Sequence, residues 1–213
     1  MSSRSWPARA LACLERAFVT GTDTGVGKTH VTARLASAQR ERGLDTVALK
    51  PVCCGGREDA EILRAACGNE LALEEVNPVW LPEPLAPAVA AKGKPPSVDA
   101  LEEWFHRITL GRQSVLVEGA GGWLVPLSPG KTMADLAARL GLPVVIVVAN
   151  RLGCLNHALL TLASVRAHGL DCQGFILNTC RTAPEDVSPA TNLRALEDAS
   201  GLPVLHELPW ETV

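Results

Sequence analysis

A glycine-containing segment near the N-terminus constrains the fold more than any other part of the sequence. Residues 21–29 read GTDTGVGKT; they follow the short apolar run of residues 18–20 and precede an amphipathic helical pattern. Strand, glycine loop and helix in this order form a phosphate-binding unit, in which backbone N–H groups and the helix N-terminus face the phosphates. Lys28 is then predicted to bridge the terminal phosphates, and the Thr29 hydroxyl to bind Mg²⁺.

The spacing within this segment departs from the usual pattern GxxxxGK[ST]. Gly21 lies six residues before Gly27 instead of five, and Thr22 occupies the position where glycine is expected. The GK[ST] triplet alone often occurs by chance, so the flanking strand and helix patterns support the nucleotide-binding interpretation.

Short β-branched runs alternate with helical patterns along the rest of the chain. This alternation predicts an α/β fold, P-loop NTPase-like, with a mostly parallel sheet and helices on both faces. Because the runs are almost continuously apolar, we expect both faces of the sheet to be buried. The predicted strands are Ala17 to Thr20, Thr46 to Leu49, Ser114 to Val117, Val144 to Ala149, Gly174 to Leu177 and Val204 to Leu205.

The chain length and the punctuation of the sequence predict one main domain. A chain of 213 residues with 47% hydrophobic residues can bury a full core. We expect a single domain over residues 17–213, preceded by a poorly ordered N-terminal extension over residues 1–16. Prolines crowd the region after Asn77, which predicts a long ordered loop that either covers a site or is a surface excursion.

Charge and composition exclude several functions. The net charge is −3, the pI is about 6.0, and basic residues are scattered, so a nucleic-acid partner is not expected. No apolar run approaches the roughly 20 residues of a membrane helix. The seven cysteines show no CxxC pair, which favours reduced thiols and a cytoplasmic location.

Two charged residues are predicted to complete the phosphate site from neighbouring strand ends. Glu118 follows the strand Ser114 to Val117 and precedes small residues that allow close backbone approach to a ligand, so it is the best candidate for a Mg²⁺ ligand. Lys50 ends another strand and is expected to point into the ligand crevice, although a solvated strand-end lysine is the alternative. Asp59 is a second candidate metal ligand, in what looks locally like a solvated turn.

Two cysteines, Cys53 and Cys54, follow Lys50 in a glycine-bounded stretch. A reactive thiol would need a nearby base, and none can be identified from the sequence. We interpret both as small turn residues.

Five segments in this order make the chain similar to the dethiobiotin synthetase family. The segments are GTDTGVGKT at 21–29, KPV at 50–52, VEGAGGW at 117–123, LGCLNHA at 152–158 and LPW at 208–210. The resemblance implies an enzyme that uses ATP and Mg²⁺ to carboxylate diaminononanoate with carbon dioxide or bicarbonate. The carbamate would then be phosphorylated, and ring closure to a cyclic urea would release phosphate.

The resemblance also implies roles for individual residues and a homodimer whose subunits share active sites. By this resemblance Lys50, Lys28 and Thr24 are catalytic, and Thr29, Asp59 and Glu118 bind the metal. The implied nucleotide-binding set comprises Gly25, Val26, Gly27, Lys28, Thr29, His30, Asp59, Glu118, Gly119, Ala120, Gly121, Asn178, Thr179, Pro209, Trp210 and Glu211. The implied substrate-binding set comprises Thr24, Lys50, Cys54 and, from the partner subunit, a helix-opening loop of Gly153, Cys154, Leu155 and Asn156.

The sequence departs from the family pattern at three places. Cys54 stands where a small hydroxyl residue is expected, the loop before Asp59 is short, and residues 85–88 are more apolar than expected. Two alternatives to a synthetase of this kind are a partitioning-type nucleotide switch and another small-molecule kinase or synthetase. The switch would carry a lysine early in the phosphate loop, and residues 21–26 contain none.

Overall fold

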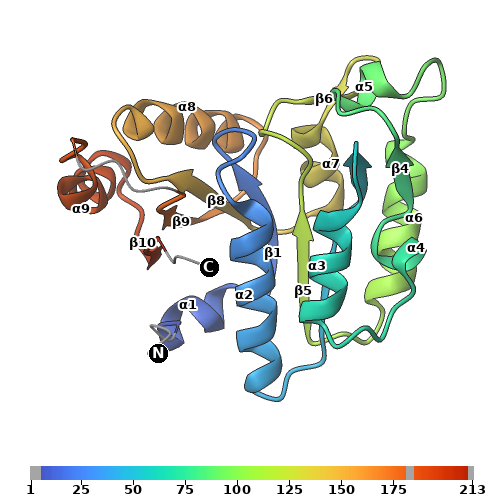
Figure 1. Cartoon of the computed structure of the whole chain (residues 1–213), viewed down its shortest axis with the longest axis horizontal. Helices are drawn as coiled ribbons and strands as arrows, with labels where there is room; N and C mark the ends of the chain where they lie inside the picture. The colour runs from blue at the N-terminus through green and yellow to red at the C-terminus, as the bar shows by residue number, and fades with distance from the viewer. Residues whose placement is uncertain (1–5, 181–184, 211–213) are drawn as a thin grey trace.

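The computed structural model describes residues 6–180 and 185–210, which contain a six-stranded parallel sheet. The strand order is β10-β9-β8-β1-β5-β2, and every neighbouring pair is parallel. Figure 1 shows β1 and β5 side by side. The strands are β1 (Arg16–Gly21), β2 (Thr46–Leu49), β5 (Ser114–Glu118), β8 (Val144–Ala149), β9 (Cys172–Asn178) and β10 (Val204–Leu208).

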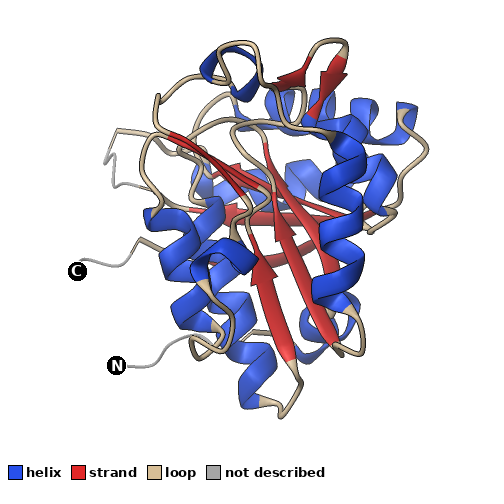
Figure 2. Cartoon of the chain, turned by 90° about the vertical axis from the view of Figure 1, so that its right-hand side faces the viewer, coloured by secondary structure: helices blue, strands red, loops and turns tan. Residues whose placement is uncertain are grey.

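Both faces of the sheet are buried, as the continuous apolar runs predict. Along β5, Val115 and Val117 belong to one hydrophobic cluster and Leu116 to another on the opposite face. The first cluster packs against the later helices and the second against α1 to α3, so that the strands run between helices on both sides (Figure 2). This is the predicted fold class.

Except for the first, each helix follows one strand and precedes another along the chain. Gly141 and Gly201 have φ of 64° and 71° and end α7 and α9, as helix-terminating glycines do. None of the helices within the described residues is both long and apolar enough to cross a membrane. The helices are α1 (Ala8–Cys13), α2 (Lys28–Glu41), α3 (Glu58–Ala66), α4 (Leu73–Val76), α5 (Pro87–Ala90), α6 (Val98–Thr109), α7 (Met133–Leu140), α8 (Cys154–Ala167) and α9 (Pro189–Ser200).

The segment before β1 is not poorly ordered over residues 6–16, contrary to expectation. Its helix α1 buries Ala10 and Leu11, and Trp6 packs against His206 of β10 with ring centroids 4.5 Å apart. The folded unit therefore begins before residue 17, because apolar residues of this segment cover the α2 side of the sheet. The first five residues of the predicted extension lie outside the described residues.

The proline-rich region contains short regular elements. Strand β4 (Val79–Leu81) pairs in parallel with β3 (Val52–Cys54), and α5 follows. Cys53 and Cys54 thus lie in a strand and not in a turn. A second small sheet, β6 (Pro126–Ser128) with β7 (Lys131–Thr132), follows the glycines after β5.

Candidate active site

The phosphate loop connects β1 to α2 at the carboxyl edge of the sheet. Gly25 and Gly27 have φ of 75° and 85°, values that side-chain-bearing residues rarely adopt, and Gly27 directly precedes the first turn of α2. The loop therefore depends on glycine at both positions. The chain leads from β1 toward β2 at one edge of the sheet and from the neighbouring β8 toward β9 on the other side. The loop therefore lies at a switch point of the topology, where α/β proteins bind ligands.

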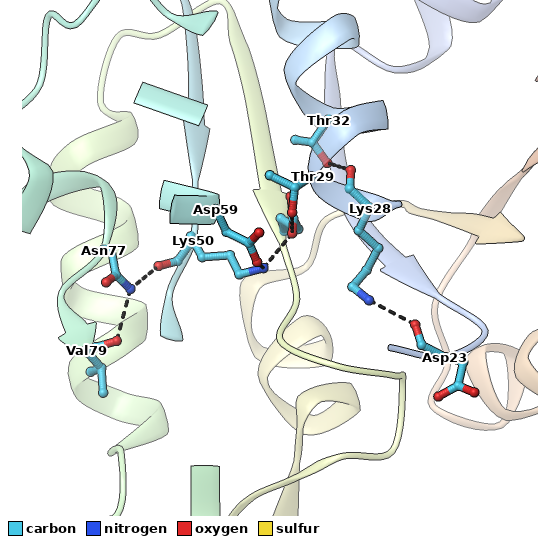
Figure 3. Close-up of polar contacts among 9 residues, drawn as sticks. Asp23, Lys28, Thr29, Thr32, Lys50, Asp59, Asn77 and Val79 are labelled. Carbon is cyan, nitrogen blue, oxygen red and sulfur yellow. Dashed lines mark hydrogen bonds and ion pairs between the residues drawn. The ribbon is translucent and has the colours of Figure 1, made fainter. Parts of the chain in front are cut away.

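Lys28 turns back over this loop. Its ammonium is buried and donates a hydrogen bond to the Asp23 carbonyl at 3.0 Å (Figure 3). Burial, followed by repulsion from Lys50, lowers the pKa of Lys28 to about 8. A phosphate group would remove both penalties by supplying negative charge.

Four side chains meet beside the phosphate loop. They come from α2, the ends of β2 and β5, and the N-terminus of α3. The Lys50 ammonium at the end of β2 lies 2.5 Å from Glu118 Oε1 and 2.7 Å from Asp59 Oδ2. The Thr29 hydroxyl donates to the same Glu118 oxygen at 2.7 Å. We call Thr29, Lys50, Asp59 and Glu118 the acid–lysine cluster.

The charges of the acid–lysine cluster stabilise one another. Burial opposes the charged form of Lys50, but the Glu118 and Asp59 carboxylates outweigh it and raise the pKa of Lys50 above its ordinary value. Burial likewise works against the Asp59 carboxylate, yet Lys50 holds the pKa of Asp59 below its usual range. Asp59 thus lies at the start of a helix and is ion-paired, rather than in a simple solvated turn.

The oxygen atoms of this cluster fit a Mg²⁺ ion bound together with phosphates. Glu118 is fully buried, and its Oε2 atom has no hydrogen-bond partner. A buried oxygen without a partner costs free energy, and a bound ligand that contacts this atom would remove the cost. The described residues contain no group of three or more His, Cys, Asp or Glu able to hold a metal alone. Mg²⁺ usually binds one or two carboxylates plus phosphate oxygens and water, so a hydroxyl and two carboxylates suffice.

A cavity of about 380 Å³ opens next to the acid–lysine cluster. Thr24, Lys50 and Asp59 form its polar part, and residues 84–87 of the proline-rich region form an apolar wall. The proline-rich region therefore borders this cavity. The other residues around the cavity are Val52, Cys53, Cys54, Gly56, Ala120, Gly121 and Val125.

The two cysteines of the cavity are protonated thiols. Burial raises the pKa of Cys53 to about 11 and also raises the pKa of Cys54 above its ordinary value. Neither is a thiolate at neutral pH, which agrees with the absence of an assigned nucleophilic role. Cys54 does lie on the cavity, where the resemblance implies a substrate contact.

Other predicted residues lie around the loop without lining the cavity. Asn178 is buried at the end of β9 and donates to the Val26 carbonyl at 2.9 Å, so it braces the phosphate loop. Its predicted contact with adenine stays a prediction. Gly119 is buried against Phe18. His30, Pro209 and Trp210 are exposed and Thr179 is half-buried, and Glu211 lies outside the described residues.

The predicted helix-opening loop lies apart from the cavity of its own chain. Gly153, with φ of 88°, directly precedes α8. Leu152 and Asn156 are exposed, whereas Cys154 is buried. None of residues 153–156 is among those lining the cavity. The structure therefore does not bring this loop to the cavity of its own chain.

The sequence does not predict that two residues, Asn77 and Arg57, lie close to the site. Asn77 is almost fully buried and hydrogen-bonds to the Lys50 carbonyl, and Arg57 contacts Asn77. The only local signal was the position of Asn77 directly before Pro78, which indicates a turn and not a contact 27 residues away.

The lowered pKa of Lys28 predicts a pH dependence of nucleotide binding. Because phosphates favour the charged ammonium, ATP binding at pH above 8 must be accompanied by proton uptake, and the affinity is expected to fall as pH rises from 8 to 9.5. Calorimetric titrations in buffers of different ionisation enthalpy measure this uptake. Lys28→Arg, which stays charged, is the control and should lose the dependence; equal affinities for the unmodified protein at pH 7.5 and 9.5 would contradict it.

The fold and the phosphate loop define a P-loop nucleotide-binding protein. A family model described as an AAA domain matches residues 15–213. Among solved structures, the septum site-determining protein MinD with Mg-ADP from Pyrococcus horikoshii OT3 aligns with a TM-score of 0.60 at 20% identity, over 92% of this chain and 82% of that one. A ParA family ATPase from Chlorobium tepidum TLS gives 0.58 at 14% identity, over 92% and 84%. These likenesses concern the fold alone.

Relatives with similar sequences identify a narrower family than the fold does. The ATP-dependent dethiobiotin synthetase BioD of Akkermansia muciniphila is 42% identical over 90% of both chains. The protein of the same name from Anaeromyxobacter dehalogenans (strain 2CP-C) is 46% identical over 91% of this chain and 89% of its own. The chain belongs to the ATP-dependent dethiobiotin synthetase family.

Proposed function

We propose that this protein is an enzyme that forms dethiobiotin from 7,8-diaminononanoate and carbon dioxide, using Mg-ATP. The observation that carries the proposal is the acid–lysine cluster, which lies between the phosphate loop and the 380 Å³ cavity. Phosphates on one side of the cluster and a bound organic substrate on the other would meet at Lys50. Membership of the synthetase family supports this choice of substrates.

The proposed reaction passes through two anions. One amine attacks carbon dioxide and loses a proton to give a carbamate, and a carbamate oxygen then attacks the γ-phosphorus, releasing ADP. The second amine attacks the carbonyl carbon of the mixed anhydride, expels phosphate and loses a proton, which closes the cyclic urea. Both intermediates carry negative charge that preorganised cations stabilise.

The residues of the chain suit these steps. Lys50 presents a charged ammonium to the cavity and would hold the carbamate, while Lys28 would contact the transferring phosphate. Thr29, Asp59 and Glu118 would hold Mg²⁺, which when bound neutralises charge on the phosphates. The apolar wall of residues 84–87 matches the hydrocarbon chain of a diamino acid.

The direct test supplies ATP, Mg²⁺, bicarbonate and diaminononanoate and measures phosphate release together with the cyclic urea by mass spectrometry. Phosphate should appear in equal amount to dethiobiotin and only when the diamine is present. Phosphate release that ignores the diamine would refute the proposal.

We further propose a homodimer in which residues 153–156 of one subunit complete the cavity of the other. Support comes from the N-terminus of α8, which can receive a carboxylate, and from the absence of these residues from the cavity of their own chain. The strongly exposed Leu152 and Val187 provide apolar surface nearby; Asp186, next to Val187, accepts a hydrogen bond from the Leu152 amide at 2.9 Å.

Shared sites predict complementation between two inactive variants. A mixture of Lys50→Met and Asn156→Ala proteins, exchanged by mild dilution and reconcentration, should regain about a quarter of normal activity, because half of the dimers are mixed and each holds one intact site. Sedimentation equilibrium gives the oligomeric state. A monomer, or a mixture no more active than its parts, would exclude shared sites.

A further inference from the structure

We propose that Asn77 and Arg57 are positioning residues, which hold the backbone of Lys50 and the first turn of α3 in the geometry that brings Lys50 and Asp59 together. The functional part of this inference rests on the proposed synthetase reaction. Within the described part of the chain, neither residue lines the cavity, and neither hydrogen-bonds to the phosphate loop.

Asn77 uses its whole carboxamide to tie the end of β2 to the start of β4. The side chain is nearly fully buried, and Nδ2 donates to the Lys50 carbonyl at 2.8 Å and to the Val79 carbonyl at 3.0 Å (Figure 3). The Lys50 amide in turn donates to the Val76 carbonyl at 2.9 Å. Both backbone polar groups of Lys50 are therefore bound by residues 76 and 77.

Arg57 connects Asn77 to the helix that carries Asp59. Its guanidinium donates from Nε to Asn77 Oδ1 at 3.1 Å and from a terminal nitrogen to the Asn77 carbonyl at 3.0 Å. The Arg57 backbone carbonyl accepts from the Glu61 amide at 3.0 Å, so Arg57 is also the first residue to accept a hydrogen bond from α3. Asp59 lies two residues further on.

These contacts close a ring. It runs from the Lys50 backbone through Asn77 and Arg57 to α3 and Asp59, and returns through the 2.7 Å ion pair between Asp59 and the Lys50 ammonium. The guanidinium also lies 5.8 Å from the centroid of the Trp80 ring, and Trp80 donates to the Gly55 carbonyl. The ring thus fixes the position of Lys50 from both its backbone and its ammonium.

A displaced Lys50 would weaken the chemical step more than nucleotide binding. Misplacement of a catalytic group by about 1 Å can cost about 10²-fold in rate, whereas the phosphate loop is held by other contacts. Loss of Asn77 should therefore lower kcat and leave the dissociation constant for ATP nearly unchanged.

The chain offers a matched control for the test. Gln39, at the far end of α2 from the phosphate loop, is also a fully buried carboxamide; it donates to the Leu11 carbonyl at 2.7 Å and accepts from Arg42 at 2.5 Å. The variants Asn77→Ala and Arg57→Ala are compared with Gln39→Ala and Arg42→Ala. Asn77→Asp replaces the donor to the Lys50 and Val79 carbonyls with a carboxylate oxygen, which repels both carbonyls, and it keeps an acceptor for Arg57.

The measurements are kcat and KM for the diamine, the dissociation constant for ATP, the thermal unfolding midpoint, and the ¹⁵N NMR signal of the Lys50 ammonium, assigned with Lys50→Met. We expect Asn77→Ala and Asn77→Asp to lower kcat about 10- to 100-fold with ATP affinity within about twofold. The Lys50 signal should shift or broaden in both variants. In Gln39→Ala the unfolding midpoint should fall while kcat and the Lys50 signal stay unchanged. The double variant Asn77→Ala/Arg57→Ala should lose less than the product of the two single losses.

The proposal is overturned if Asn77→Ala lowers kcat no more than Gln39→Ala does, or if ATP affinity falls in proportion to kcat. If the unmodified protein forms no dethiobiotin, the proposed function fails, and the Lys50 NMR signal alone then decides the positioning role. An undisturbed signal in both Asn77 variants refutes that role.

Discussion

Replacement of Lys50 by methionine is expected to lower the rate of dethiobiotin formation about 10²- to 10³-fold, the usual cost of removing one group that stabilises developing negative charge. Methionine keeps the length and bulk of the side chain but removes the ammonium that lies between Glu118 and the cavity. Mass spectrometry of the product and a phosphate assay measure the loss.

The same substitution should also lower the free energy of unfolding. Glu118 is fully buried, and its carboxylate would lose the cation 2.5 Å away. Breaking a buried pair in this way costs about 3–5 kcal/mol. Urea unfolding of the variant measures this effect, and Mg-ATP should restore part of the stability, because ligands that bind the folded state stabilise it.

Lys92→Met is the control for Lys50→Met. Lys92 also pairs with a carboxylate, Glu83, but its side chain is 70% exposed, and exposed pairs contribute little. This variant should keep its activity and its unfolding midpoint. If Lys50→Met retained a comparable activity, Lys50 would have no place in the reaction.

Replacement of Gly27 by alanine is expected to weaken ATP binding about 10²-fold. Two costs add at this position. A residue with a side chain at φ of 85° is disfavoured by about 1–2 kcal/mol, and a methyl group there would come within 2.1 Å of Asn178 Nδ2, an overpacking that costs about 1–3 kcal/mol. Relief requires the phosphate loop to move away from its binding conformation. Calorimetric titration with Mg-ATP measures the result.

Gly43→Ala is the control for the backbone cost alone, at a position outside the phosphate loop. Gly43 has φ of 84°, but a methyl group there would have no neighbour within 4 Å. We expect a lower free energy of unfolding in this variant and an unchanged affinity for ATP. If the Gly27 and Gly43 variants bind ATP equally well, neither the backbone strain at Gly27 nor its contact with Asn178 affects the phosphate loop.

Much of the fold could be predicted from the sequence because buried parallel strands leave a strong local signal. The predicted strands at residues 46–49 and 144–149 coincide with β2 and β8, and the other four differ from the observed strands by a few residues at their ends. The N-terminal helix was missed because α1 is only six residues long and its burial depends on packing against the distant α2 and β10. Short helices of this kind are stabilised by packing and not by their own sequence.

Some features of the candidate site could likewise be predicted from the sequence, and others could not. That Lys28 and Thr29 begin a helix after a glycine loop, and that Lys50 and Glu118 each end a buried strand, could be predicted from the sequence because these features depend on neighbouring residues. The adjacency of β1, β5 and β2, which brings Thr29, Glu118 and Lys50 together, is visible only in the folded chain. The tertiary structure alone revealed that Asn77 and Arg57 support Lys50. Strand order and side-chain contacts to distant carbonyl groups have no periodic pattern, since they arise only when the folded chain brings remote segments together.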